Sequence, residues 1–139
     1  MNITSALAGQ KHTELAYLAG YLDGEGCFRV ANTAIVSVSN TYPWTLVILQ
    51  QYFGGHIRLH TRANKAHRTC YEWAVCGSKA RSCITTLIPY LWEKREQAEL
   101  ILEIFKYPNK SRRRKTLKRK LKAKKRINYT LDRVNRGMR

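Results

Sequence analysis

Two acidic residues stand among glycines at the end of the segment Leu18–Gly26, which reads LAGYLDGEG. Asp23 and Glu25 flank Gly24 directly after an apolar stretch with helical spacing. Carboxylates are unfavourable at the C-terminal end of a helix, because the helix dipole is negative there. A hard divalent ion such as Mg²⁺ takes carboxylate, carbonyl, water and phosphate oxygens as ligands. In a basic protein this pattern favours a metal site over a solvated turn.

Small residues recur at a spacing of four in the same segment, at Ala16, Gly20 and Gly24. On one face of a helix, such a stripe lets another backbone approach closely. A glycine inside a helix lowers helix stability by about 1 kcal/mol relative to alanine, so close packing at Gly20 should compensate for this loss. The packing partner is either another element of the same chain or a second copy across a two-fold axis. In the second case two acidic helix ends, and two metal sites, would lie side by side.

The charge of the chain indicates a polyanionic partner. Its 139 residues include 26 Lys and Arg against 9 Asp and Glu, a net charge of +17. Such a balance favours nucleic acid first and an anionic membrane surface second. We expect no transmembrane helix and no signal peptide, because long apolar runs are missing. The 4 cysteines contain no C-x-x-C pair, and we expect them to be reduced and mostly buried in an intracellular protein. The expected location is a bacterial or phage-infected cytoplasm, or an organelle.

Most of this charge lies at the C-terminal end. Residues 108–139 hold 15 basic residues and one acid, whereas residues 1–107 hold 11 basic and 8 acidic residues. Between Lys110 and Arg126, twelve of seventeen residues are Lys or Arg. Self-repulsion is expected to keep this block open until it binds phosphates, although it could simply be a solvated tail. We therefore predict a domain at 1–107 and a basic DNA-binding extension at 108–139, with Pro108 at the boundary.

The elements that position these residues follow from hydrophobic periodicity. A helix is expected from Thr13, as N-cap, to about Leu22, followed by a hairpin of strands 27–31 and 34–39. A helix at about 43–53 precedes a second hairpin near 57–62 and 68–75. Two further helices follow, one capped by Ser78 and an amphipathic one at 93–107. Four strands with helices on one side make a two-layer α+β domain.

The other face of the expected sheet is mostly cationic. A solvated face is ordinary for an antiparallel sheet. In a protein with a polycationic tail, however, this face favours contact with nucleic acid. Its basic residues are Arg29, Arg58, His60, Arg62 and Arg68.

The segment LAGYLDGEG resembles the signature of the LAGLIDADG homing endonucleases, with Leu-Ala-Gly, then Asp, then an acid followed by Gly. The resemblance covers about residues 10–107, and the motif occurs once. It implies an αββαββα core with a four-stranded antiparallel sheet. Single-motif members of the family are homodimers that cut near-palindromic DNA, so it also implies a homodimer. The implied interface residues are Ala16, Leu18, Ala19, Gly20 and Gly24.

The resemblance also implies roles for individual residues. Glu25 stands at the acid that binds metal, Gly24 would add its backbone carbonyl, and Asp23 would brace the helix end. Asn40 resembles the polar residue that helps to position the water nucleophile. Lys94 resembles the basic residue near the scissile phosphate. These residues would form the catalytic site.

The implied activity is metal-dependent hydrolysis of both strands of a long, near-palindromic DNA target. Mg²⁺ is the implied cofactor, with Mn²⁺ or Ca²⁺ as substitutes. Trp44 falls where some relatives carry a basic residue, a departure from the family's outer solvent network. Candidate contacts to bases or phosphates are Arg29, Ser37, Ser39, Arg58, His60, Arg62, Arg68 and Glu72 in the domain, and Arg112, Arg113, Arg114, Lys118, Arg119 and Lys122 in the extension.

Two other functions fit the same sequence. A relative with weak or no cleavage could bind intron RNA as a splicing cofactor, or maturase, because a basic tail suits RNA as well as DNA. A DNA-binding regulator that has lost cleavage is the second, and the acid at Glu25 argues against it.

Overall fold

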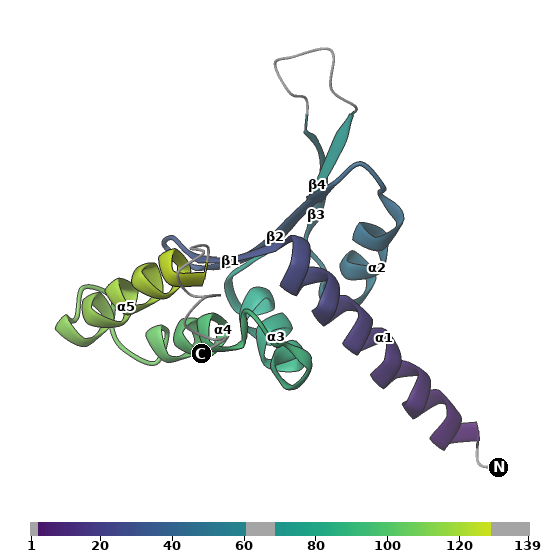
Figure 1. Ribbon diagram of the computed structural model, residues 1–139, viewed down its shortest axis with the longest axis horizontal. Coiled ribbons are helices and arrows are strands. Elements are labelled where there is room, and N and C mark those ends of the chain that lie inside the picture. Colours follow the sequence, from purple (N-terminus) through teal and green to yellow (C-terminus); the bar gives the residue numbers. More distant parts are fainter. Residues whose placement is uncertain (1–2, 61–68, 129–139) are drawn as a thin grey trace, which may run out of the picture.

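The order of helices and strands confirms the predicted αββαββα core. The computed structural model describes residues 3–60 and 69–128, with side chains placed within 9–126 of these ranges. Two further helices follow the core (Figure 1). The elements are α1 (Ile3–Glu25), β1 (Gly26–Val30), β2 (Ala34–Asn40), α2 (Trp44–Phe53), β3 (His56–His60), β4 (Cys70–Cys76), α3 (Gly77–Leu87), the 3₁₀ helix η1 (Ile88–Tyr90), α4 (Arg95–Ile104) and α5 (Arg112–Asn128).

The four strands form one antiparallel sheet in the order β1-β2-β4-β3. The register aligns Phe28, Val36 and Val75, so that all three side chains lie on one sheet face. Helices α1 to α4 cover this face (Figure 1). Trp73 and Leu22 are fully buried between the two layers. The predicted two-layer α+β architecture is therefore confirmed.

Helix α1 is longer than the sequence predicted. It begins at Ile3 instead of Thr13, and the Thr13 hydroxyl donates within the helix to the Gly9 carbonyl at 3.0 Å. The preceding residues include strong helix formers, which extend the helix towards the N-terminus. Strand β1 begins at Gly26 with no intervening loop. A Cβ at Gly26 would lie 2.8 Å from the Leu22 carbonyl oxygen, so only glycine fits this junction.

Helix α3 begins without the predicted Ser78 cap. It starts at Gly77, directly after β4, and Cys76 occupies the N-cap position. The Gly77 backbone N–H donates to the Thr33 hydroxyl at 2.7 Å. The β1–β2 turn thus satisfies an amide at the helix start, in place of a Ser78 cap. The backbone φ of Gly77 is +67°, in the left-handed region that glycine adopts without steric cost.

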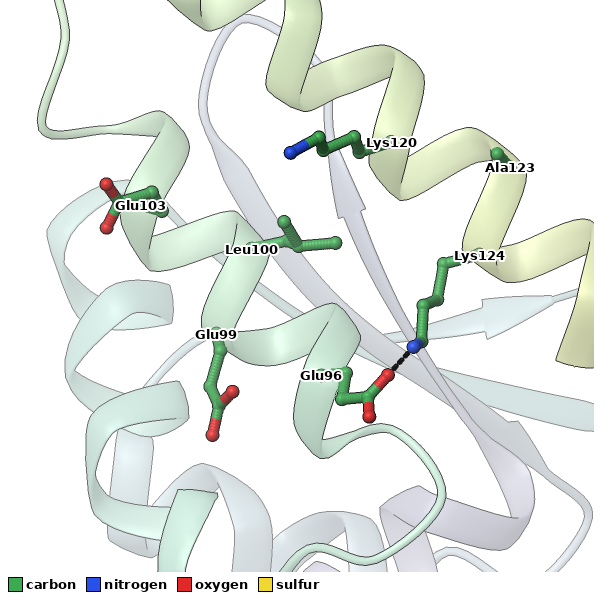
Figure 2. Close-up of a pocket in the computed structure, with 7 residues that line it drawn as sticks. All are labelled: Glu96, Glu99, Leu100, Glu103, Lys120, Ala123 and Lys124. Atoms are coloured by element: carbon green, nitrogen blue, oxygen red, sulfur yellow. Dashed lines mark ion pairs between the residues drawn. The ribbon is translucent and has the colours of Figure 1, made fainter.

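The basic block is folded, and the prediction that it stays open is wrong. Leu117 and Leu121 of α5 are buried in the same core cluster as α4. These two residues are four apart and share one helix face, while cations occupy the rest of the surface. Lys124 also pairs with Glu96 across the groove between α4 and α5 (Figure 2). Apolar burial on one narrow stripe therefore outweighs the self-repulsion of the block.

The cysteines are only partly as expected. All four are free, but Cys27 and Cys76 are exposed, whereas Cys70 and Cys83 are buried. Burial raises the pKa of the Cys83 thiol to about 12, so this thiol is protonated at neutral pH. None of the described helices combines the length and the apolar character needed to cross a bilayer.

Candidate active site and nucleic-acid interface

The carboxylate of Asp23 holds the start of α4 against the end of α1. Asp23 is only 8% exposed. Its Oδ2 accepts the backbone N–H of Trp92 at 2.7 Å, and its Oδ1 accepts that of Lys94 at 3.1 Å. Both oxygens are therefore occupied by backbone donors within the protein. Asp23 is placed to fix the relative position of the two helices, not to bind a cation directly.

Lys94 brings a positive charge to the C-terminal end of α1. It occupies the N-cap position of α4 and is 6% exposed. Its ammonium group donates a hydrogen bond to the Asp23 carbonyl oxygen. A cation at this end of a helix interacts favourably with the helix dipole. Lys94 therefore compensates part of the negative charge that Asp23 and Glu25 concentrate there.

Glu25 presents the free carboxylate of this region. It is exposed in the last position of α1, and Gly24 beside it is also exposed. Within residues 3–60 and 69–128, no side chain forms an ion pair or hydrogen bond with the Glu25 carboxylate. The last carbonyls of a helix also lack intrahelical donors. Glu25 and the Gly24 carbonyl thus offer two hard oxygen ligands from neighbouring residues at the end of α1.

These two oxygen donors fit a magnesium ion whose coordination shell is completed by other ligands. Mg²⁺ usually keeps several waters and binds through one or two carboxylates together with substrate phosphates. In the part of the chain that the structure describes, no three His, Cys, Asp or Glu side chains cluster at one place. At this end of α1, one chain would therefore supply only part of a coordination shell, with Glu25 as the charged ligand.

Asn40 is connected to helix α1 by a hydrogen bond to Tyr21, a residue that the sequence did not indicate as part of the site. Its Nδ2 donates to the Tyr21 hydroxyl at 2.9 Å, and its Oδ1 accepts the Tyr42 N–H at 3.1 Å. Burial raises the pKa of Tyr21, the Asn40 hydrogen bond lowers it, and the nearby Glu25 carboxylate raises it further. Tyr21 thus contacts Asn40 and is close enough to Glu25 for the carboxylate to influence its pKa. The only signal in the sequence is that Tyr21 and Glu25 are four residues apart on one helix.

The small residues of α1 form an open stripe on the surface. Ala16, Gly20 and Gly24 are all exposed. A Cβ added at Gly20 or Gly24 would meet no atom within 4 Å, so Gly20 packs against no described element of its own chain. By contrast, Leu18 and Ala19 have 0% exposure and face the core. Their prediction as dimer-interface residues is wrong, because the helical period turns them away from the stripe.

The predicted polar residues of the domain share the sheet face opposite the core. Ser39, Glu72 and Arg58 are cross-strand neighbours in the register of β2, β4 and β3. Arg58 pairs with Glu72 at 3.3 Å, which orients both side chains. The same face carries Arg29, Ser37 and His60. The predicted contacts Arg62 and Arg68 lie outside the described residues.

Helix α5 carries exposed cations on the sides that do not pack on α4. One predicted contact of this helix is wrong. Arg114 is only 9% exposed, and its guanidinium stacks over the Phe105 ring at 4.6 Å from the centroid. Arg114 therefore joins α5 to α4 and does not face outward. The predicted residues that remain exposed are Arg112, Arg113, Lys118, Arg119 and Lys122.

The fold is similar to that of homing endonucleases. No protein-family model matches the sequence, and a comparison with curated proteins finds no match. I-CvuI, in complex with its target in the presence of Ca, is 25% identical with a TM-score of 0.64, over 81% of this chain and 82% of the I-CvuI chain. I-CvuI in complex with the I-CreI target in the presence of Mg, with the DNA not cleaved, is 26% identical with a TM-score of 0.57, over 70% and 68%.

Two more distant structures share the fold. The archaeal intron-encoded homing endonuclease I-Vdi141I, complexed with DNA, is 16% identical with a TM-score of 0.65, over 82% of this chain and 85% of its own. The LAGLIDADG meganuclease I-CpaMI, bound to uncleaved DNA, is 18% identical with a TM-score of 0.53, over 66% and 35%. The resemblance to homing endonucleases that the LAGYLDGEG segment predicts is therefore confirmed.

Proposed function

We propose that this protein is a site-specific homing endonuclease that hydrolyses both strands of double-stranded DNA with divalent metal ions. The observation that carries the proposal is the end of α1, where the exposed Glu25 stands two residues after Asp23, whose carbonyl oxygen accepts a hydrogen bond from the Lys94 ammonium. The fold that presents this end is similar to that of I-CvuI, which has been seen in complex with its DNA target. A carboxylate and a fixed cation at one place suit hydrolysis of a phosphodiester.

Each residue of the site has a distinct task in this mechanism. Glu25 and the Gly24 carbonyl would hold Mg²⁺, for which Mn²⁺ or Ca²⁺ could substitute. When bound, the ion acidifies a water molecule and neutralises charge on the phosphate. Lys94 lowers the cost of the extra negative charge that develops on the scissile phosphate. Asn40 and Tyr21 use their hydrogen-bonding groups to orient water on the Glu25 side of the site.

A homodimer would place two such sites together, one for each strand. The exposed stripe of Ala16, Gly20 and Gly24 would let two copies of α1 pack closely across a two-fold axis. The two Glu25 carboxylates would then lie side by side at the ends of the paired helices. A two-fold protein reads a two-fold target, so the DNA site would be near-palindromic.

The sheet face opposite the core would lie over the major groove and read bases. Its arginines, Arg29 and Arg58, suit guanine, the commonest specific contact. Helix α5 would hold backbone phosphates beside this face and carry no sequence information. Candidate contacts on the sheet also include Ser37, Ser39, His60 and Glu72.

Incubation with Mg²⁺ and a library of duplex targets, followed by sequencing of the cut ends, tests the proposed activity. We expect one near-palindromic site to be cut on both strands, leaving short 3′ overhangs. Chelation of the metal should stop cleavage and leave most DNA binding intact. Tight binding of a structured RNA with no metal-dependent cut in the library would instead favour the splicing-cofactor function.

Charge removal on the exposed side of α5 should weaken DNA binding without changing its sequence preference. We expect the triple variant Lys118→Gln, Arg119→Gln and Lys122→Gln to reduce the slope of log affinity against log salt by about 3. Substitution is cleaner than deletion of the helix, because Leu117 and Leu121 belong to the core. The measurement is a salt titration of binding to the selected target and to an unrelated duplex.

A triple variant of equal charge outside α5 provides the control. Lys11→Gln, Lys79→Gln and Lys106→Gln remove three exposed cations outside the proposed interface. This control should keep the wild-type salt slope to within about one unit. Equal slopes for the two triple variants would show that α5 holds no phosphates. A selective loss of affinity for the target over the unrelated duplex would show instead that α5 reads bases.

A further inference from the structure

Lys125 connects the last turns of α5 to the strand that follows the candidate active site. Its ammonium group donates a hydrogen bond to the backbone carbonyl of Phe28 in β1. Strand β1 is an edge strand that begins directly after Glu25, and the C-terminal part of α5 lies beside it (Figure 1). Phe28 is three residues beyond Glu25, about 10 Å along an extended strand. Lys125 is therefore within reach of a DNA strand that passes Glu25.

Two other cations from different elements lie close to Lys125. Arg29 follows Phe28 in β1, and Lys94 begins α4, which packs against β1. Burial lowers the pKa of the Lys125 ammonium, the Cys27 thiol opposes this, and Arg29 and Lys94 lower the pKa further. Lys94 and Lys125 thus donate to the carbonyl oxygens of Asp23 and Phe28, on either side of Glu25 in the sequence, and Arg29 directly follows Phe28.

None of these three cations forms an ion pair with an acidic side chain among the described residues. The ion pairs within residues 3–60 and 69–128 are Arg58–Glu72, Lys106–Glu103 and Lys124–Glu96. Like charges held near one another in a half-buried place disfavour their own charged forms. An anion that sits between them would remove this cost. The phosphate of a nucleic acid backbone has the required charge.

A purely structural role does not explain a lysine at this position. Leu117, Leu121 and the Lys124–Glu96 pair already dock α5 on α4. A neutral donor could serve the Phe28 carbonyl without repulsion from Arg29 and Lys94. The lysine adds a charge that is unfavourable in the free protein and becomes favourable when an anion binds.

We propose that Lys125, together with Arg29 and Lys94, binds a DNA phosphate next to the scissile bond, so that α5 is part of the cleavage centre. This inference rests on the proposed endonuclease function. The bound phosphate would fix the DNA strand relative to Glu25. Lys125 would therefore act on the rate of cleavage at saturating DNA more than on affinity.

The test is single-turnover cleavage of the selected target at saturating protein and Mg²⁺. We expect Lys125→Gln to slow cleavage ten- to a hundredfold, and Lys125→Arg to restore the rate to within about threefold of wild type. Lys120→Gln is the matched control, because Lys120 is an exposed cation of the same helix that lines the groove against α4 (Figure 2). It should cleave at the wild-type rate.

A second arm locates the phosphate on the DNA. Single methylphosphonates, which neutralise one phosphate each, are placed within a few nucleotides of the cut. At the contacted phosphate, the effects of the methylphosphonate and of Lys125→Gln on the rate should not add, because both remove one interaction. At the other phosphates the two effects should add.

The outcomes separate this inference from the proposed function. If the wild type neither binds nor cuts a specific target, the proposed function fails, and this inference fails with it. If the wild type cuts while Lys125→Gln and Lys120→Gln cut equally well, only the role of Lys125 is overturned. A normally folded Lys125→Arg variant that stays as slow as Lys125→Gln would also overturn it, since charge would not be the cause. Thermal unfolding of each variant excludes loss of folded protein as the explanation.

Discussion

Replacement of Glu25 with glutamine is expected to slow Mg²⁺-dependent DNA cleavage by at least about a thousandfold, because it removes the proposed charged ligand of the metal. The substitution keeps the size of the side chain. Glu25 is exposed, and no described side chain pairs with its carboxylate, so the fold should be unaffected. DNA binding without metal should be equal or slightly tighter, since one negative charge near the phosphates disappears.

Single-turnover cleavage and a binding titration in chelator measure the two effects of Glu25→Gln separately. Glu99→Gln is the control, because Glu99 is an exposed acid that lines the groove between α4 and α5 (Figure 2). It should cleave and bind as the wild type does. Cleavage by Glu25→Gln within about tenfold of wild type would refute the metal-binding role of Glu25.

The sequence predicted the fold well wherever local patterns determine it. Richness in β-branched residues predicted the first hairpin and alternation predicted the second, and the observed β1 and β2 differ by no more than one residue at either end from the predicted 27–31 and 34–39. The errors fell at junctions, where tertiary contacts replace local caps. The Gly77 amide, for example, bonds to Thr33, which is 44 residues away. No local pattern around Ser78 contains that contact.

The residues of the candidate site also divide into those that local sequence predicts and those that depend on tertiary contacts. The motif predicted that Glu25 lies at the end of α1. Its nine adjacent residues contain both the end of the helix and the start of the next strand, so no distant contact was needed for this prediction. It did not reveal Tyr21, whose contact with Asn40 depends on how α1 crosses β2. The prediction for the basic block was wrong because its twelve cations dominate the composition. The packing of α5 depends instead on two apolar residues, Leu117 and Leu121. Local charge density predicted repulsion, whereas a narrow apolar stripe determined the structure.

The largest structural effect is expected for Gly20→Leu, which should convert the proposed homodimer to a folded monomer. Within one protomer the new side chain meets open space, since a Cβ at Gly20 has no neighbour within 4 Å. Leucine is also a better helix former than glycine, by up to about 1 kcal/mol, so the protomer should be no less stable. Both effects should keep the single protomer folded.

In the dimer the same substitution would fall on two facing helices. A two-fold axis places both leucines in one interface, so a steric cost of about 1–3 kcal/mol per site counts twice and weakens association at least about thirtyfold. Gly20→Ala adds a single methyl group and should weaken association less. Cleavage of both strands should fall together with the dimer, because each protomer supplies one Glu25.

Sedimentation over a range of protein concentrations, together with thermal unfolding, distinguishes these effects. Ala123→Leu is the control, since Ala123 is exposed on α5, away from the stripe of Ala16, Gly20 and Gly24. It adds three carbon atoms to a helical residue, one fewer than Gly20→Leu adds, and should leave the dimer intact. A wild type that stays monomeric with and without DNA, or a Gly20→Leu dimer of unchanged affinity, would contradict the interface. In either case the glycines of α1 would need a different partner, because no described element of the chain lies within reach of Gly20.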